Sequence, residues 1–218
     1  RRSPRSTLDR SSAESDVYKR QIWDFSEILL VAFKLGNEIT LSQSYINIQN
    51  IVIAGMGGSA IGGDVVSILE KDNLDIPFVV CRGYSLPNWV NEHSLVVCSS
   101  YSGDTEETLS ALDDALNKKA QVCGITTGGE LGKRLKKIGK DLVIIPSGLQ
   151  PRAALAFSFV PMVKLLEKMG VLESGMKTWI NNTIDALKEV TAGNKALTDA
   201  VRTGVDLTHL KLCDQQIK

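Results

Sequence analysis

Gly55-Met56-Gly57-Gly58-Ser59-Ala60-Ile61-Gly62-Gly63-Asp64 is the stretch that decides the fold of this chain. It follows a short apolar run at residues 50–54, and a continuous apolar run is typical of a strand buried on both faces of a sheet. Helical spacing resumes at once, through Ala60, Val65, Ile68 and Leu69. A buried strand, a glycine-rich loop and a helix in this order indicate one unit of a parallel α/β sheet.

The same alternation continues along the chain. Apolar runs predict further strands at residues 76–81, 95–99, 122–126 and 142–145. Helical spacing predicts helices at residues 105–119, 131–140, 153–169 and near 177–192, and a first helix that runs from Ile22 and ends at Gly36. We therefore expect an α/β fold, in which a five-stranded parallel sheet is flanked by helices in a flavodoxin-like three-layer arrangement and is followed by a helical linker.

Composition narrows the class of protein. The 218 residues include 43% hydrophobic ones, which is enough for one α/β core, and the formal net charge is zero. A neutral chain gives no electrostatic reason to expect a nucleic acid or an anionic membrane as partner. No apolar run approaches the roughly 20 residues of a membrane span. None of the four cysteines has metal-ligand spacing, so we expect a reducing, cytoplasmic setting with no metal or cofactor.

The first 21 residues differ from the rest of the chain. They carry six basic and three acidic groups, are rich in serine and show no apolar periodicity. The run Asp16-Val17-Tyr18-Lys19-Arg20-Gln21 resembles the translation of an adapter used in DNA sequencing libraries. We expect residues 1–21 to be a non-native or disordered leader that is separate from the fold.

A second loop makes the first one informative about function. Ser99-Ser100-Tyr101-Ser102-Gly103-Asp104-Thr105 also joins a buried strand to a helix, and it offers hydroxyl groups at Ser100, Ser102 and Thr105. Ligands of open parallel sheets lie beyond the carboxyl ends of the strands, where helix N-termini favour anions. The glycines at 57, 58, 62 and 63 let the backbone approach a ligand, and Ser59 adds another hydroxyl. Together the two loops predict a sugar-phosphate site.

Two other interpretations stay open at this point. Thr105 precedes a helix and can be an ordinary N-cap residue. Gly55-x-Gly57-x-x-Ala60 also matches the dinucleotide fingerprint, but the next strand ends in Arg82 where an acidic residue would hold the ribose of NAD. A dinucleotide site would therefore have to bind NADP, through Arg82. A dinucleotide site also leaves the serine-rich loop unexplained.

The two loops resemble those of the sugar isomerase (SIS) domain, and more narrowly the first domain of bifunctional phosphoglucose/phosphomannose isomerases. The similarity covers roughly residues 23–169. Two further motifs carry it, Arg82-Gly83-Tyr84-x-Leu86-Pro87 and Pro146-Ser147-Gly148-Leu149-Gln150-Pro151-Arg152-Ala153-Ala154. The resemblance implies that the sugar is lined by Gly57, Gly58 and Ser59 and that the phosphate is held by Ser100, Ser102 and Thr105. It also implies that Arg152 points at the reacting end of the sugar.

The family activity is aldose–ketose isomerisation through an enediol, which converts glucose 6-phosphate or mannose 6-phosphate to fructose 6-phosphate. The family's glutamate base and its histidine lie in a second SIS domain, and neither motif occurs in this chain. The resemblance therefore implies an SIS domain at residues 22–170, and a helical linker with the truncated start of a second domain at 171–218. It implies a homodimer at full length and a fragment that binds phosphosugar without the catalytic base. A non-catalytic, regulatory sugar-phosphate-binding module is the alternative.

One residue departs from the family pattern, which has asparagine at the position of Asp104. An acidic side chain beside a phosphate dianion would weaken binding unless its carboxylate is directed elsewhere. The position of that carboxylate is therefore a specific question for the structure.

Overall fold

The computed structural model describes residues 24–150, 153–173 and positions 182, 183, 185, 186, 188 and 189. The chain divides into two compact units, residues 1–176 and 177–218, and every element below belongs to the first. Arg152 and the expected leader at residues 1–21 lie outside the described residues. The expected boundaries at residues 22–170 and 171–218 therefore stay a prediction.

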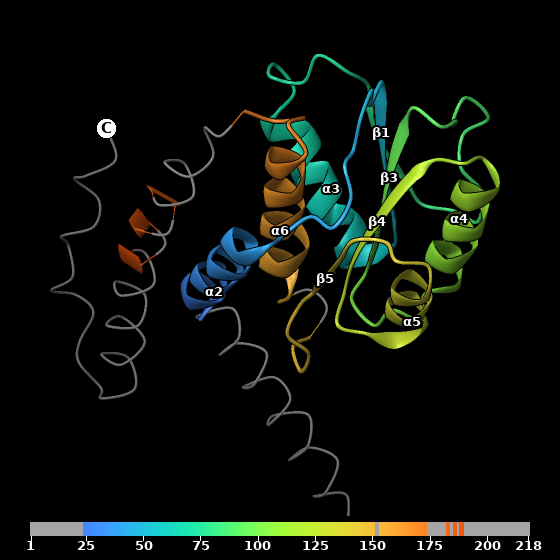
Figure 1. Ribbon diagram of the computed structural model, residues 1–218. Coiled ribbons are helices and arrows are strands. Elements are labelled where there is room, and N and C mark those ends of the chain that lie inside the picture. Colours follow the sequence, from blue (N-terminus) through green and yellow to red (C-terminus); the bar gives the residue numbers. More distant parts are fainter. Residues whose placement is uncertain (1–23, 151–152, 174–181, 184, 187, 190–218) are drawn as a thin grey trace, which may run out of the picture. The chain divides into compact units, whose positions relative to one another are not determined.

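Five parallel strands form one sheet in the order β2-β1-β3-β4-β5 (Figure 1). The strands are β1 (Asn50–Gly55), β2 (Phe78–Cys81), β3 (Ser94–Ser100), β4 (Gln121–Thr126) and β5 (Leu142–Ile144). The central pairing of β1 with β3 aligns Asn50 with Ser94 and Gly55 with Ser99. Because all pairs are parallel, every strand ends at the same edge of the sheet. The predicted α/β fold is confirmed.

Helices cover both faces of the sheet. They are α2 (Phe25–Glu38), α3 (Gly57–Leu69), α4 (Glu106–Asn117), α5 (Gly129–Lys137) and α6 (Leu155–Lys168). Figure 1 shows α3 and α6 on one side of the sheet and α4 and α5 on the other, with α2 packed against α6. Right-handed crossovers between parallel strands place the helices in this way.

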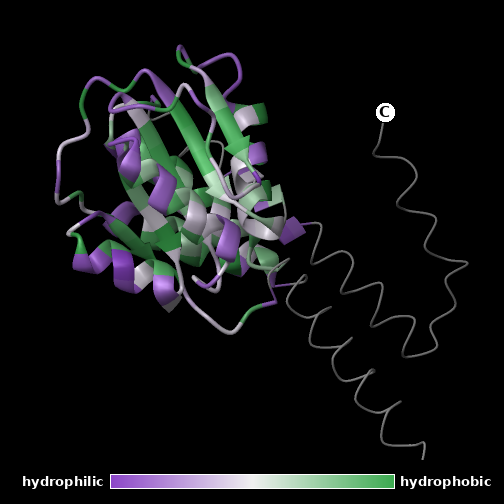
Figure 2. Cartoon of the chain, turned by 90° about the vertical axis from the view of Figure 1, so that its right-hand side faces the viewer, coloured by the Kyte–Doolittle hydropathy of each residue, from purple (hydrophilic) through white to green (hydrophobic). Residues whose placement is uncertain are grey.

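Burial of the central strands explains why short apolar runs identified them. All seven residues of β3 are buried, and in β1 and β4 all but the first residue are. Val52, Val96 and Val122 pack on one face with Leu112 and Leu135, which come from α4 and α5. Figure 2 shows the resulting pattern, in which hydrophobic strands lie between helices whose outer surfaces carry hydrophilic residues.

Gly36 does not end the first helix, so this prediction is wrong. α2 continues to Glu38, and Gly36 is buried. A Cβ atom at Gly36 would lie 2.6 Å from Cγ of Lys164 in α6, so the glycine allows the two helices to approach closely. A helix-stopping glycine and a packing glycine look alike in a single sequence.

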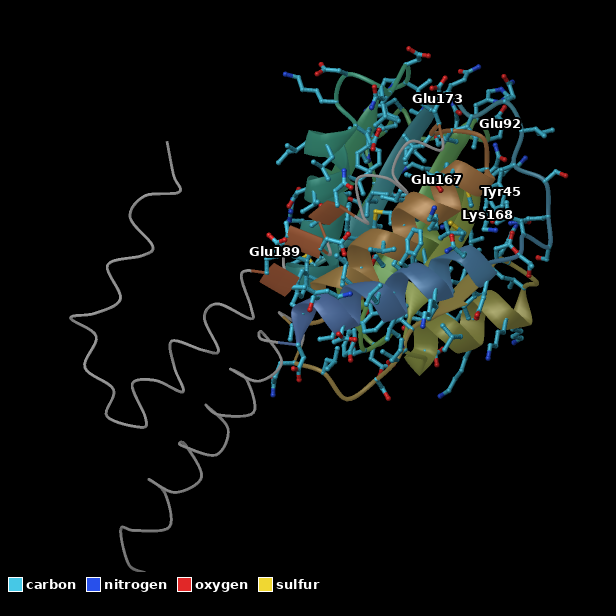
Figure 3. All side chains as sticks on the ribbon, turned by 90° about the vertical axis from the view of Figure 1, so that its left-hand side faces the viewer. Tyr45, Glu92, Glu167, Lys168, Glu173 and Glu189 are labelled. Carbon is cyan, nitrogen blue, oxygen red and sulfur yellow. The ribbon has the colours of Figure 1, made fainter. Side chains whose placement is uncertain are left out.

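A connector between α2 and β1 is fixed at the amino edge of the sheet. Asp141 Oδ1 accepts hydrogen bonds from the backbone N–H and the hydroxyl of Ser42, at 2.7 and 2.6 Å. The Tyr45 hydroxyl donates to the carbonyl oxygen of Val122 at 3.4 Å (Tyr45 is labelled in Figure 3). These contacts lie at the end of the sheet opposite to the glycine- and hydroxyl-rich loops.

Within the described residues, every helix is too short or too polar to cross a lipid bilayer.

Candidate functional site

The first loop leads from β1 directly into α3, and its glycines have different roles. Gly57 adopts a φ of +50°, and a Cβ placed there would meet nothing within 4 Å, so its backbone faces open space. A Cβ at Gly55 would lie 2.7 Å from the carbonyl oxygen of Ser99, so only glycine fits where the ends of β1 and β3 meet. Gly57 and Gly58 begin α3 and leave its first N–H groups available to an anion.

Gly62 and Gly63 pack against neighbouring elements rather than facing the glycine loop. A Cβ at Gly62 would lie 2.7 Å from Cβ of Ser158 in α6, and one at Gly63 would lie 3.1 Å from a methyl group of Ile53 in β1. Both glycines are buried and allow α3 to pack closely on its neighbours. The expectation that they approach a ligand is wrong, because they lie inside the helix rather than before it.

The second loop, which joins β3 to α4, contains a hydrogen-bonded pair of hydroxyl groups. The side-chain oxygens of Ser100 and Thr105 share a hydrogen bond of 2.8 Å, and Ser100 Oγ also accepts from Gly103 N–H at 3.0 Å. Gly103 has a φ of +80°, which favours glycine in this tight turn. Thr105 occupies the N-cap position of α4 but makes no side-chain cap hydrogen bond. Its hydroxyl turns toward Ser100 instead, so the N-cap interpretation of this side chain does not hold.

Ser59 joins the two loops. Its side chain is buried, and its hydroxyl oxygen accepts a hydrogen bond from the backbone N–H of Tyr101 at 3.1 Å. Ser102 is exposed, and its Oγ accepts from Asp104 N–H at 3.2 Å. The structure therefore brings Ser59 to the loop that carries Ser100 and Ser102, as the sequence predicted from the alignment of strand ends.

The carboxylate of Asp104 is bound to another helix. Its Oδ1 accepts a hydrogen bond from the backbone N–H of Glu130 at 2.8 Å, in the first turn of α5. The positive end of that helix stabilises a negative charge there. The side chain of Asp104 is thus held by the start of α5.

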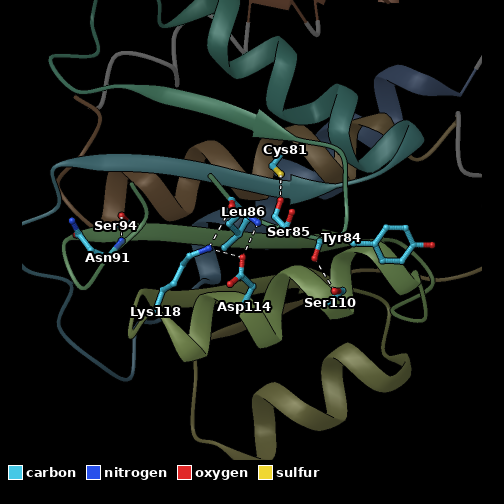
Figure 4. Close-up of polar contacts among 9 residues, drawn as sticks. All are labelled: Cys81, Tyr84, Ser85, Leu86, Asn91, Ser94, Ser110, Asp114 and Lys118. Atoms are coloured by element: carbon cyan, nitrogen blue, oxygen red, sulfur yellow. Dashed lines mark hydrogen bonds and ion pairs between the residues drawn. The ribbon is translucent and has the colours of Figure 1, made fainter. Parts of the chain in front are cut away.

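The loop after β2 is anchored on α4 (Figure 4). Leu86 N–H donates to Asp114 Oδ2 at 2.8 Å, and Ser110 Oγ donates to the carbonyl oxygen of Tyr84 at 2.7 Å. A hydrogen bond from the Lys118 ammonium, 2.7 Å long, lowers the pKa of Asp114. Hydrogen bonds to α4 therefore fix the motif that begins at Arg82.

Arg82 itself forms an ion pair with Asp64 of α3. Its guanidinium is already engaged by a carboxylate, and this pairing does not favour recognition of the 2′-phosphate of NADP. The position of Arg82 therefore gives the alternative of an NADP site no support.

Neither metal ligands nor reactive thiols gather in the described part of the chain. It contains no group of three or more His, Cys, Asp or Glu side chains placed to hold a metal ion. Burial raises the pKa of the Cys98 thiol to about 12, and burial also raises the pKa of Cys123. Two such thiols stay protonated at neutral pH and are poor nucleophiles.

Known proteins resemble this chain in sequence. A bifunctional phosphoglucose/phosphomannose isomerase from Caldicellulosiruptor bescii is 43% identical over 169 residues, which are 78% of this chain and 50% of that protein. The chain contains an SIS-type phosphosugar isomerase domain. The isomerase of the same name from Thermoplasma acidophilum is 45% identical over 115 residues, 53% of this chain and 35% of that protein. This SIS chain thus spans about half the length or less of the curated relatives it matches.

Solved structures agree with the SIS fold. The C-terminal domain of glucosamine-fructose-6-phosphate aminotransferase from Francisella tularensis superposes with a TM-score of 0.55 at 19% identity. The match covers 79% of this chain and 52% of that chain. No family model matches the SIS chain.

Tyr101 and Asp104 lie within the serine-rich loop, but their partners were not identified from the sequence: Leu149 follows β5, and Glu130 lies in the first turn of α5. The residue types gave no signal for these pairs, because each pair joins residues that are more than 20 positions apart.

Proposed function

We propose that this SIS domain binds a phosphorylated hexose at the carboxyl edge of its sheet. The domain would serve an isomerase that interconverts glucose 6-phosphate or mannose 6-phosphate with fructose 6-phosphate. The observation that carries the proposal is the hydroxyl pair of Ser100 and Thr105 beside the open glycine loop, in a chain 43% identical to a bifunctional isomerase. The phosphosugar, as ligand, and a homodimer of the full-length protein are parts of the same proposal.

The hydroxyl groups suit a phosphate without a metal ion or a lysine. A phosphate dianion needs several donors that converge from different directions. Ser102 and Thr105 offer hydroxyl groups from one loop, and the starts of α3 and α4 offer free backbone N–H groups with the positive ends of two helix dipoles. In this proposal Gly57, Gly58 and Ser59 line the sugar.

The proposed reaction moves one proton between two carbon atoms. After ring opening, a base removes the proton from C2 of the aldose, and the electrons form the C1–C2 double bond of an enediolate. The proton then returns to C1 while the hydroxyl proton moves from O2 to O1, so that a carbonyl group forms at C2 and a hydroxyl group at C1. In this proposal Arg152 stabilises the enediolate, because a guanidinium cation matches the negative charge that develops on its oxygens.

Calorimetric titration of the 218-residue chain with glucose 6-phosphate tests the binding. We expect wild-type protein to bind it and Ser102→Ala to weaken binding by about tenfold or more, because a hydrogen bond to a charged group contributes about 1.5–3 kcal/mol. Ser44→Ala is the matched control, since Ser44 is another exposed serine and lies on the connector at the amino edge. Equal affinities of the Ser102→Ala variant and wild type would show that the phosphate lies elsewhere.

A further inference from the structure

Tyr101 connects the serine-rich loop with three other segments at the carboxyl edge. Its backbone N–H donates to Ser59 Oγ at 3.1 Å, and its carbonyl oxygen accepts from Thr127 N–H at 3.1 Å. Its hydroxyl oxygen accepts a hydrogen bond from the backbone N–H of Leu149 at 3.0 Å. One residue after β3 therefore holds the segments that follow β1, β4 and β5.

The segment 146–149 depends on the Tyr101 hydroxyl. Its first three residues are exposed, and Gly148 has a φ of +94°. The bond from Leu149 to Tyr101 is the one hydrogen bond that residues 146–149 make with other described residues. Ile145, just before the segment, is held separately by a backbone bond to β4 of 3.0 Å. Removal of the hydroxyl would therefore release this segment and leave the sheet intact.

We infer that Tyr101 is a positioning residue for the sugar part of the ligand. Its hydroxyl holds residues 146–149 beside the serine-rich loop, so that this segment lines the sugar while Ser100, Ser102 and Thr105 face the phosphate. The inference rests on the proposed function, because it assigns the two ends of a phosphosugar to different segments of one site. The backbone of Tyr101 maintains the phosphate loop through Ser59, and its side chain acts on the sugar side.

Tyr101→Phe tests the sugar side of the site separately from the phosphate side, because it removes the hydroxyl but keeps the ring and both backbone hydrogen bonds. We expect about a fivefold loss of affinity for glucose 6-phosphate, the usual effect of one hydrogen bond, and no change for inorganic phosphate. Titrations of the 218-residue chain with each ligand measure both. Tyr45→Phe is the matched control, because it also removes a hydroxyl hydrogen bond, but at the amino edge. We expect it to change neither affinity.

Hydrogen exchange without ligand tests the structural part of the inference. We expect the amide of Leu149 to exchange faster in Tyr101→Phe than in wild type. Unchanged exchange would overturn the inference, whatever the titrations with glucose 6-phosphate and phosphate show. Equal losses for glucose 6-phosphate and phosphate, or no loss for either, would overturn the positioning role and leave the proposed function standing. A wild-type chain that fails to bind glucose 6-phosphate would overturn both.

Discussion

Gly36 contacts a buried ion pair. Lys164 and Glu167 of α6 lie 2.7 Å apart, with side chains only 8% and 9% exposed (Glu167 is labelled in Figure 3). The Lys164 ammonium also lies 5.0 Å from the centre of the Phe33 ring. The stem of Lys164 passes over Gly36, so this glycine makes room for a charged side chain inside a helix pair. Breaking such a buried pair is costly, because it leaves one charge without its partner.

We expect Gly36→Ala to destabilise the domain by about 1–2 kcal/mol, although alanine normally favours a helix by about 1 kcal/mol over glycine. The new Cβ would lie 2.6 Å from Cγ of Lys164 and would displace its stem. Unfolding in urea measures the change. Gly132→Ala in α5 is the control, since a Cβ there stays at least 3.6 Å from its neighbours, and we expect it to be neutral or stabilising. A stabilised Gly36→Ala would show that α2 and α6 separate at little cost.

At the scale of elements, Asp141 attaches the α2–β1 connector to the amino edge of the sheet. Burial acts to raise the pKa of Asp141, but the hydrogen bonds from Ser42, Tyr45 and Gln43 together outweigh burial, and the pKa lies below its usual value. A carboxyl group whose pKa is lowered by folding stabilises the native state above its unfolded-state pKa of about 3.9. That contribution disappears as the pH falls through the lower, folded-state pKa.

The stability of wild type should therefore fall more steeply below about pH 4 than that of Asp141→Asn, which loses the charge at every pH. We expect the variant to be less stable at pH 7, with the difference shrinking toward pH 2. Urea unfolding at a series of pH values measures this. Asp72→Asn serves as control, because Asp72 is exposed. A constant difference between wild type and Asp141→Asn across this range would contradict the assignment to the charge of Asp141.

The strands that are buried along all or nearly all of their length could be predicted from the sequence. β1, β3 and β4 are buried on both faces, so their apolar runs stood out in the sequence. Packing roles across helices were not predictable. Gly36 and Gly62 face α6 through contacts with Lys164 and Ser158, which lie nearly 100 or more positions later in the chain. Local patterns carry no information on such pairs.

At the scale of the whole molecule, the site follows from the parallel sheet. Two loops more than 40 residues apart in sequence meet because β1 and β3 are neighbours and end together. The meeting of Ser59 with the serine-rich loop could thus be predicted from the order of strands and loops alone. The links from Tyr101 to Leu149 and from Asp104 to Glu130 could not, because they depend on the conformations of loops after β4 and β5.

We predict that the 218-residue chain binds a phosphosugar but does not isomerise it. Hydroxyl groups and helix N-termini suffice to hold a phosphosugar, but isomerisation needs a base that takes a proton from C2. We propose that the family's glutamate base and its histidine are not supplied by this chain, so we expect no conversion of glucose 6-phosphate to fructose 6-phosphate at concentrations that saturate binding. A coupled assay for fructose 6-phosphate measures this, with the full-length Caldicellulosiruptor bescii isomerase as positive control. Turnover by the chain would mean that it contains the base, and it would exclude a purely regulatory module.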